Sequence, residues 1–332
     1  MRQTLFFTTQ WFASFFLLLV LFACKTPKLS DAEEKYRVGE YYKAAEIYRA
    51  VYGKTKPDDR VLRGDIAYKM GECNQALNNS ARAMTAYLNA LRYGYSDSAL
   101  YLRLGQVMQK EGKYTDAIDY YRKYLTYVPN DPLAINGIIG SEIASGFIDK
   151  STPYIVKRAD LFNSLYGEFS PMYFGKKDEE LYFSSSRGAV LKDSVSGITG
   201  RKDNNFFVAK KNSQGDWQKP EELKGALNTL FDEGTPSFTA DGLTMYYTYC
   251  ARNSQKPMTA EIYMASRSEG QWGKGKKVSI QMDSSMLLAH PAISPDGEFL
   301  YFVSEESTGH GGKDIYRAKR INEADFGKIE NV

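Results

Sequence analysis

The chain has few of the residues on which metal and catalytic sites most often depend. Its 332 residues include two histidines, His290 and His310, and three cysteines, Cys24, Cys73 and Cys250. The histidines are far apart, and no cysteine or carboxylate stands at ligand spacing from them. This scarcity argues against a zinc site and against a histidine-based triad. We therefore expect no metal, no cofactor and no catalytic residue.

Other absences narrow the function further. A net charge of +3 gives no strong field toward nucleic acid. The chain has no Gly-x-Ser-x-Gly pentapeptide of the kind found in propeller-bearing serine peptidases. The glycine-rich run at 309–314 lacks the spacing of a phosphate loop, so we interpret it as a hairpin between strands. The sequence thus predicts a protein that is not an enzyme and does not bind nucleic acid.

The N-terminus does contain one informative apolar run. Arg2 is followed by an apolar stretch over 12–22, then by Ala23 and Cys24. This layout is typical of a signal peptide and is too short for a spanning helix. The Leu-x-Ala-Cys ending resembles the bacterial lipobox, which implies a signal peptide over 1–23, lipidation of Cys24 and a tether over 24–30. The alternative is an ordinary secretory signal with an unmodified cysteine.

Residues 31–164 have the apolar period of helices, and part of this segment repeats every 34 residues. The slots shared by two copies hold two small residues and then a tyrosine: Gly71, Ala83 and Tyr87, then Gly105, Ala117 and Tyr121. Small residues allow the two helices of a repeat to approach, and the tyrosine fills the gap toward the next pair. The pattern resembles the tetratricopeptide repeat, which implies an α-solenoid with a concave face.

By this resemblance, the first helix of each repeat lines the concave face. The corresponding positions, which we predict to bind a partner, are Asp65, Tyr68, Glu72, Gln75, Leu102, Gln106, Gln109 and Asn136. The alternative is that these residues form an ordinary solvated helix face. The tyrosines Tyr48, Tyr87, Tyr101 and Tyr121 are better explained as core residues than as ligand contacts.

Residues 165–332 contain short aromatic and branched runs bounded by polar turns. Asp241-Gly242 precedes one such run and Asp296-Gly297 the next, and Lys177-Asp178 begins a degenerate first copy. Units of four short strands at this spacing are typical of β-propeller blades, with the Asp-Gly turn joining the first two strands. The predicted fold class is therefore α + β in separate domains, a solenoid followed by a partial, three-blade antiparallel propeller.

Two motifs carry a wider resemblance. Ser294-Pro295-Asp296-Gly297 with the strand at 300–302 resembles the WD40-like repeat PD40, which also occurs in the TolB propeller. The segment 161–171 is similar to the linker between repeats and propeller in OmpA-family envelope lipoproteins of Bacteroidetes. The resemblance implies a lipoprotein of the outer membrane, facing the periplasm, that binds envelope proteins as a scaffold, with type IX secretion as one such assembly.

The chain departs from that family at its end. Family members continue into a peptidoglycan-binding OmpA-like domain, whereas this sequence stops at its third blade, and propellers usually close with four to eight blades. We expect a fragment, a truncated product or a partner that completes the ring, with the apolar flanks of the first and third blades exposed. Peptidoglycan is a partner only if the further domain exists. The alternative functions are a TolB-like periplasmic factor and a glycan-binding uptake lipoprotein.

Overall fold

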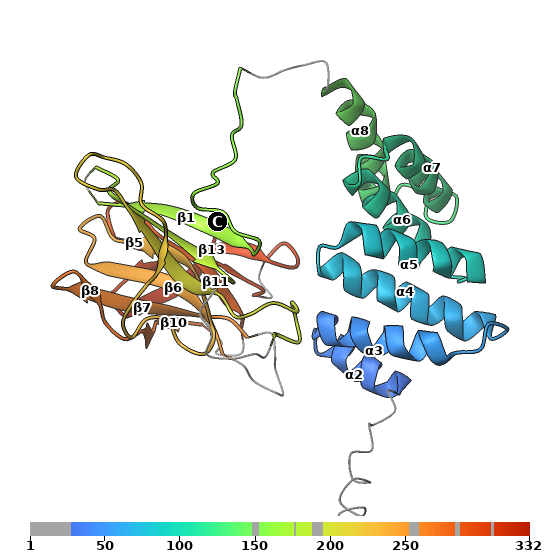
Figure 1. The fold of residues 1–332 in the computed structure, drawn as a ribbon, viewed down its shortest axis with the longest axis horizontal. Helices are drawn as coiled ribbons and strands as arrows, with labels where there is room; N and C mark the ends of the chain where they lie inside the picture. The colour runs from blue at the N-terminus through green and yellow to red at the C-terminus, as the bar shows by residue number, and fades with distance from the viewer. Residues whose placement is uncertain are drawn as a thin grey trace, which may run out of the picture.

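The computed structural model describes residues 28–147, 153–175, 177–187, 195–251, 259–282, 286–306 and 309–332. Cys24, the predicted signal peptide and most of the predicted tether lie outside these residues. A helical part comes first and a β part follows, as predicted (Figure 1). Within the described ranges, no helix is both long and apolar enough to cross a membrane.

The helical part is a stack of antiparallel helix pairs, which we call the solenoid (Figure 1). Its described helices are α2 (Leu29–Arg37), α3 (Tyr41–Lys54), α4 (Arg60–Ala76), α5 (Ser80–Tyr93), α6 (Ala99–Lys110), α7 (Tyr114–Leu125) and α8 (Pro132–Phe147). The start of α8 shows how local sequence determines where a helix begins. The Asp131 carboxylate accepts hydrogen bonds from the N–H groups of Leu133 and Ala134, at 2.8 and 3.2 Å, and Pro132 occupies the first turn.

The glycines and tyrosines of the repeat pattern pack against one another, as predicted. A Cβ atom added to Gly71 would lie 2.3 Å from the Tyr87 ring, and one added to Gly105 would lie 2.6 Å from the Tyr121 ring. Tyr121 also fills the gap toward the next repeat, where a Cβ on Gly137 would lie 2.4 Å from its ring. These glycines are therefore required by close contact with a ring.

Three of the four tyrosines predicted to be core residues are buried, namely Tyr48, Tyr87 and Tyr121. Tyr101 is partly buried, packs against the core cluster that contains Tyr121, and stacks on Tyr127 with ring centroids 5.8 Å apart. Tyr101 stands at the start of α6, where the ring of Tyr127 from the turn after α7 covers one of its faces.

The β part consists of three antiparallel sheets, which we call blades 1 to 3. Blade 1 contains β1 (Glu168–Phe174), β2 (Glu180–Ser185), β3 (Asn205–Lys210) and β4 (Glu221–Glu222). Blade 2 contains β5 (Asp232–Phe238), β6 (Thr244–Cys250), β7 (Glu261–Ser268), β8 (Gln271–Trp272) and β9 (Lys276–Lys277). Blade 3 contains β11 (Leu288–Ile293), β12 (Phe299–Ser304), β13 (Asp314–Arg320) and β14 (Asp325–Asn331), with β10 (Ser279–Gln281) pairing in parallel with β14.

Turns and bulges repeat from blade to blade. The turn between the first two strands holds a residue with positive φ at Asp178 (52°), Gly242 (69°) and Gly297 (75°), as the Asp-Gly pattern predicts. Each first strand is also interrupted by a shift of register. The residue there has positive φ and precedes a proline: Ser170 (52°), Thr235 (55°) and His290 (56°). The first strand of each blade is therefore bent by a bulge at the equivalent position.

Neighbouring blades share apolar cores, and polar contacts lock them together. The Trp272 indole N–H donates to the Tyr182 hydroxyl at 3.2 Å, and the Tyr246 hydroxyl donates to the Glu323 carbonyl at 2.8 Å. The apolar flank of blade 1 was wrongly predicted to be exposed, because Phe162 from the preceding segment and Trp217 cover it. On blade 3, Ile315 is 56% exposed.

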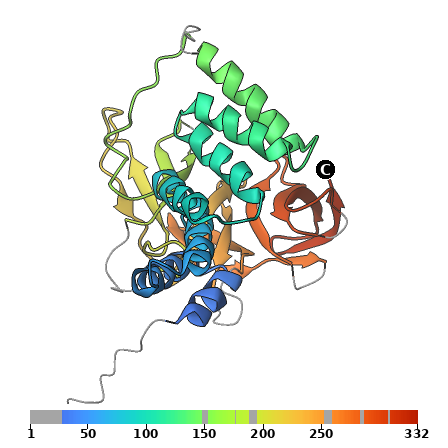
Figure 2. The same cartoon turned by 90° about the vertical axis from the view of Figure 1, so that its right-hand side faces the viewer.

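The solenoid and blade 1 touch at the N-terminus of α3, where the loop 195–204 reaches the helix (Figures 1 and 2). The N–H groups of Tyr42 and Lys43 donate to the carbonyls of Ile198 and Gly197 at 3.2 and 3.0 Å. The side chain of Glu40, at the helix cap, makes no capping hydrogen bond. The loop thus supplies acceptors for helix-end donors that would otherwise need water.

Candidate functional site

Three of the eight predicted concave-face residues, all glutamines, make hydrogen bonds within the solenoid. The Tyr87 hydroxyl donates to Gln75 Oε1 at 2.7 Å, and the Tyr121 hydroxyl donates to Gln109 Oε1 at 2.9 Å, so the same bond recurs one repeat later. The amide of Gln75 then donates to Gln106 Oε1 at 3.0 Å. These glutamines therefore connect adjacent repeats.

The remaining predicted positions differ in accessibility. Tyr68 and Leu102 are buried and belong to the solenoid core. The Glu72 carboxylate accepts the Tyr36 hydroxyl at 2.9 Å and pairs with a lysine beside it. Asp65 and Asn136 are exposed. That these residues bind a partner stays a prediction. Of these positions, Asp65 and Asn136 are the ones exposed to a partner.

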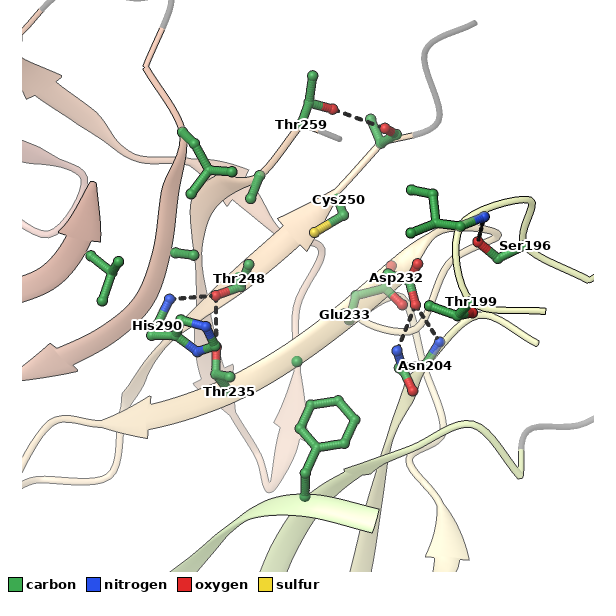
Figure 3. Close-up of a pocket in the computed structure, with 18 of the residues that line it drawn as sticks. Ser196, Thr199, Asn204, Asp232, Glu233, Thr235, Thr248, Cys250, Thr259 and His290 are labelled. Atoms are coloured by element: carbon green, nitrogen blue, oxygen red, sulfur yellow. Dashed lines mark hydrogen bonds between the residues drawn. The ribbon is translucent and has the colours of Figure 1, made fainter. Parts of the chain in front are cut away.

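A second site, which the sequence did not predict, lies where the three blades meet. It is a cavity of about 350 Å³, within the size range of small-ligand pockets. Its wall is formed by the first strands β1, β5 and β11, by strand β6, and by Ser196, Ile198 and Thr199 of the loop 195–204. Figure 3 shows its polar side chains, which include Asp232, Glu233, Thr235, Thr248, Cys250 and His290.

Several polar groups of the cavity wall bond to one another. The backbone N–H of His290 donates to Thr248 Oγ1 at 2.8 Å, and the hydroxyls of Thr248 and Thr235 are 2.6 Å apart (Figure 3). Asn204 donates to Asp232 Oδ1 through its backbone N–H and its side-chain amide, each at 2.7 Å. These bonds hold the wall of blade 2 in place against blades 1 and 3.

Glu233 is the exception in this wall. It is 1% exposed, and its Oε1 accepts hydrogen bonds from the backbone N–H and the hydroxyl of Thr229. Its Oε2 is buried and accepts no hydrogen bond within the described part of the chain. Burial raises the pKa of Glu233 to about 8, with Asp232 and Asp203 adding to the effect, while the bonds from Thr229 oppose it.

The two described cysteines, Cys73 and Cys250, are free thiols. Cys250 lines the cavity, and burial raises the pKa of its thiol to about 12. A thiol with so high a pKa is a poor nucleophile, because the thiolate is the reactive form. No group of three or more metal-ligating side chains occurs among the residues that the structure describes. The cavity feature that stands out is the buried Oε2 of Glu233, which has no hydrogen-bond partner among the described residues.

Comparison with known proteins identifies the helical part. A family model described as tetratricopeptide repeat matches residues 99–131, so the chain carries a repeat of this family. No curated protein matches the sequence.

Solved structures resemble parts of the chain. The MamA protein is 20% identical with a TM-score of 0.32, over 37% of this chain and 64% of MamA, so the match spans less than two thirds of that protein. The Sgt2 TPR domain from Aspergillus fumigatus is 17% identical with a TM-score of 0.31, over 42% of this chain and 91% of that domain. An alpha-L-arabinofuranosidase from Lactobacillus brevis is 13% identical with a TM-score of 0.33, over 52% of this chain and 55% of that enzyme.

Proposed function

We propose that this protein is a non-enzymatic lipoprotein of the bacterial outer membrane. Cys24 anchors it, it faces the periplasm, and its solenoid holds other envelope proteins in an assembly. The observation that carries the proposal is the array of tetratricopeptide repeats, an architecture whose stacked helices present an extended surface to protein partners. The blades add a second surface beside it.

The N-terminal sequence and the order of the two parts support the envelope setting. A lipobox-like ending, a repeat solenoid and PD40-like blades occur in that order in the envelope lipoproteins typified by PorE of the type IX secretion system. We propose type IX secretion as the assembly on that resemblance. The OmpA-family assignment rests on the same likeness, and peptidoglycan is a partner only if an OmpA-like domain exists.

The scaffold role is tested by charge reversal on the two faces of the solenoid. Asp65 lies on α4 at the predicted concave face, and Asp119 lies on α7, and both are exposed. We expect Asp65→Lys to remove the envelope proteins that cross-link to the full chain in cells, and Asp119→Lys to retain them. Loss in both variants, or in neither, would count against a partner on the concave face.

The anchor is tested separately by labelling cells with a radioactive fatty acid. The wild-type protein should carry the label and Cys24→Ala should not, whatever membrane each protein fractionates with. Label retained in Cys24→Ala would show that Cys24 is not the acylated residue. Neither result bears on the solenoid, so the two claims stand or fall independently.

A further inference from the structure

Helix α8 carries large apolar side chains on its exposed face. Its other face packs on α6 and α7, where Ala134 is fully buried. The exposed face holds four apolar residues at intervals of four positions, namely Ile135, Ile139, Ile143 and Phe147. These residues are 38, 48, 51 and 64% exposed, in that order. Because residues four apart are neighbours on a helix surface, the four form one line, which we call the α8 stripe.

In the repeat before α8, the second helix covers the first. Helix α7 packs against α6, and the Tyr121 ring of α7 contacts α6. A shift by the repeat period of 34 residues moves the bounds of α7 to 148–159. Pro153 stands inside this range, where a proline removes a backbone hydrogen bond and disfavours a helix. The described residues 153–167 contain no helix, and Ile155, which aligns with Tyr121, is 83% exposed.

The α8 stripe leaves an apolar surface at the end of the solenoid. Repeat arrays usually end in a unit with a polar outer face, which keeps the array soluble. The four stripe residues are uncharged. Glu142, at the edge of the stripe, pairs with Arg122 of α7 at 3.8 Å. Asn136 lies beside the stripe, and its amide can both donate and accept. An identical face would therefore meet no unneutralised like charge here.

A second copy of α8 matches this surface in shape. Residues at four-residue intervals form a ridge, and two such ridges interdigitate when helices cross at about −50°, the commonest class of helix packing. Two copies related by a two-fold axis would present the same ridge to each other. The stripe lies at the end of the solenoid opposite α2 (Figures 1 and 2), so a lipid anchor ahead of α2 would hold the opposite end at the membrane. This placement favours a protein over a lipid surface as the occupant.

We propose that the α8 stripe is a self-association surface, at which the solenoid of one copy of this chain packs against that of a second copy. One helix face per copy is small compared with a standard interface of about 1,600 Å², so we expect a dissociation constant of about 1–100 μM. This surface goes beyond the scaffold function, since it joins two copies of the chain and lies on α8, whereas the envelope partner is expected at Asp65 on α4.

Cysteine cross-linking in cells tests this contact on the full chain. Ile139 is near the middle of the stripe, so a cysteine there lies close to its own counterpart in the second copy. Val61 on α4 is 76% exposed and is the matched control. A short bismaleimide should join Ile139→Cys into a species of twice the chain mass and should leave Val61→Cys as single chains. No adduct, equal cross-linking of both variants, or an adduct with a different protein alone would overturn the proposal.

A charge placed on the stripe should separate the two copies. In cells that express two differently tagged copies, Ile139→Asp in both should lower their co-purification at least about tenfold, because each copy would bury an unpaired carboxylate in the contact. Val61→Asp should retain it, and equal co-purification of the two variants would contradict the proposal. If Ile139→Asp does not fold, as circular dichroism would show, the cross-linking experiment still decides. Asp65→Lys should leave self-association intact, so failure of the scaffold function and failure of this contact can be told apart.

Discussion

Replacing Glu233 with glutamine should change how the stability of the protein depends on pH. The folded chain holds the proton of Glu233 with a pKa of about 8, compared with an ordinary value of 4.5. Between these two values the folded state binds more protons than the unfolded state, so the wild-type protein loses stability as pH rises through this window. Below it the loss is absent, and above it the loss is complete. Glu233→Gln has no such proton to release.

The size of the effect follows from the gap between the two pKa values. Between pH 5 and pH 7.5, the wild-type protein should lose about 3 kcal/mol of unfolding free energy relative to the variant. The loss arises because the unfolded chain releases the Glu233 proton at a lower pH than the folded chain does. For a unit the size of the β part, this corresponds to about 10 °C in melting temperature. The change with pH is the quantity to compare, because the glutamine amide adds a constant offset.

Thermal melts of both proteins from pH 5 to pH 8.5 measure this change, and Glu168→Gln is the matched control. Burial alone would raise the pKa of Glu168, but hydrogen bonds from Ser164 and Ser185 and the charge of Arg187 bring it below its ordinary value. Glu168 therefore stabilises the fold above its unfolded pKa, and that stability is lost as pH falls. Parallel pH curves for wild type and Glu233→Gln would refute the reasoning about Glu233.

Three further predictions concern other parts of the chain. Gly105→Val should lower the stability of the solenoid by about 1–3 kcal/mol, because its side chain would meet the Tyr121 ring, and circular dichroism melts would detect this; an unchanged melt would contradict the close packing. Gly200 has φ +68° and a Cβ there would lie 2.2 Å from the Tyr42 ring, so Gly200→Val should detach the loop from α3 and increase the radius of gyration in small-angle scattering. Cys250 should react with iodoacetamide at pH 8 about a thousandfold more slowly than a free thiol, as peptide mapping would show, since so little thiolate is present.

The sequence revealed the repeated elements because each repeat depends on a local requirement. A glycine must face each ring at Gly71 and Gly105, and the turn at Gly242 needs a positive φ, so these residues recur at a fixed spacing. The two parts of the fold and the strands of each blade could therefore be predicted.

The cavity could not be predicted in this way, because three blades assemble it. Glu233 and His290 come from different blades, and their proximity depends on how the sheets curl. Residues 163–171 and 228–236 do share a sequence motif, in which Glu168 and Glu233 accept hydrogen bonds from the residue four positions earlier, and this repetition was present as a signal. Likewise, the covering of blade 1 by Phe162 depends on the path of the linker.

The contact between the loop 195–204 and α3 holds the solenoid and the blades closer together than the linker alone would. While Ile198 and Gly197 cap the helix, a pull between the N-terminus and the blades is carried by this contact and not by the linker. Two hydrogen bonds and their apolar surroundings break at a much lower force than the covalent backbone, so this contact would open first under load. Once it opens, the 20 residues between α8 and β1 limit how far the solenoid and the blades can separate, to about 70 Å when this segment is fully extended.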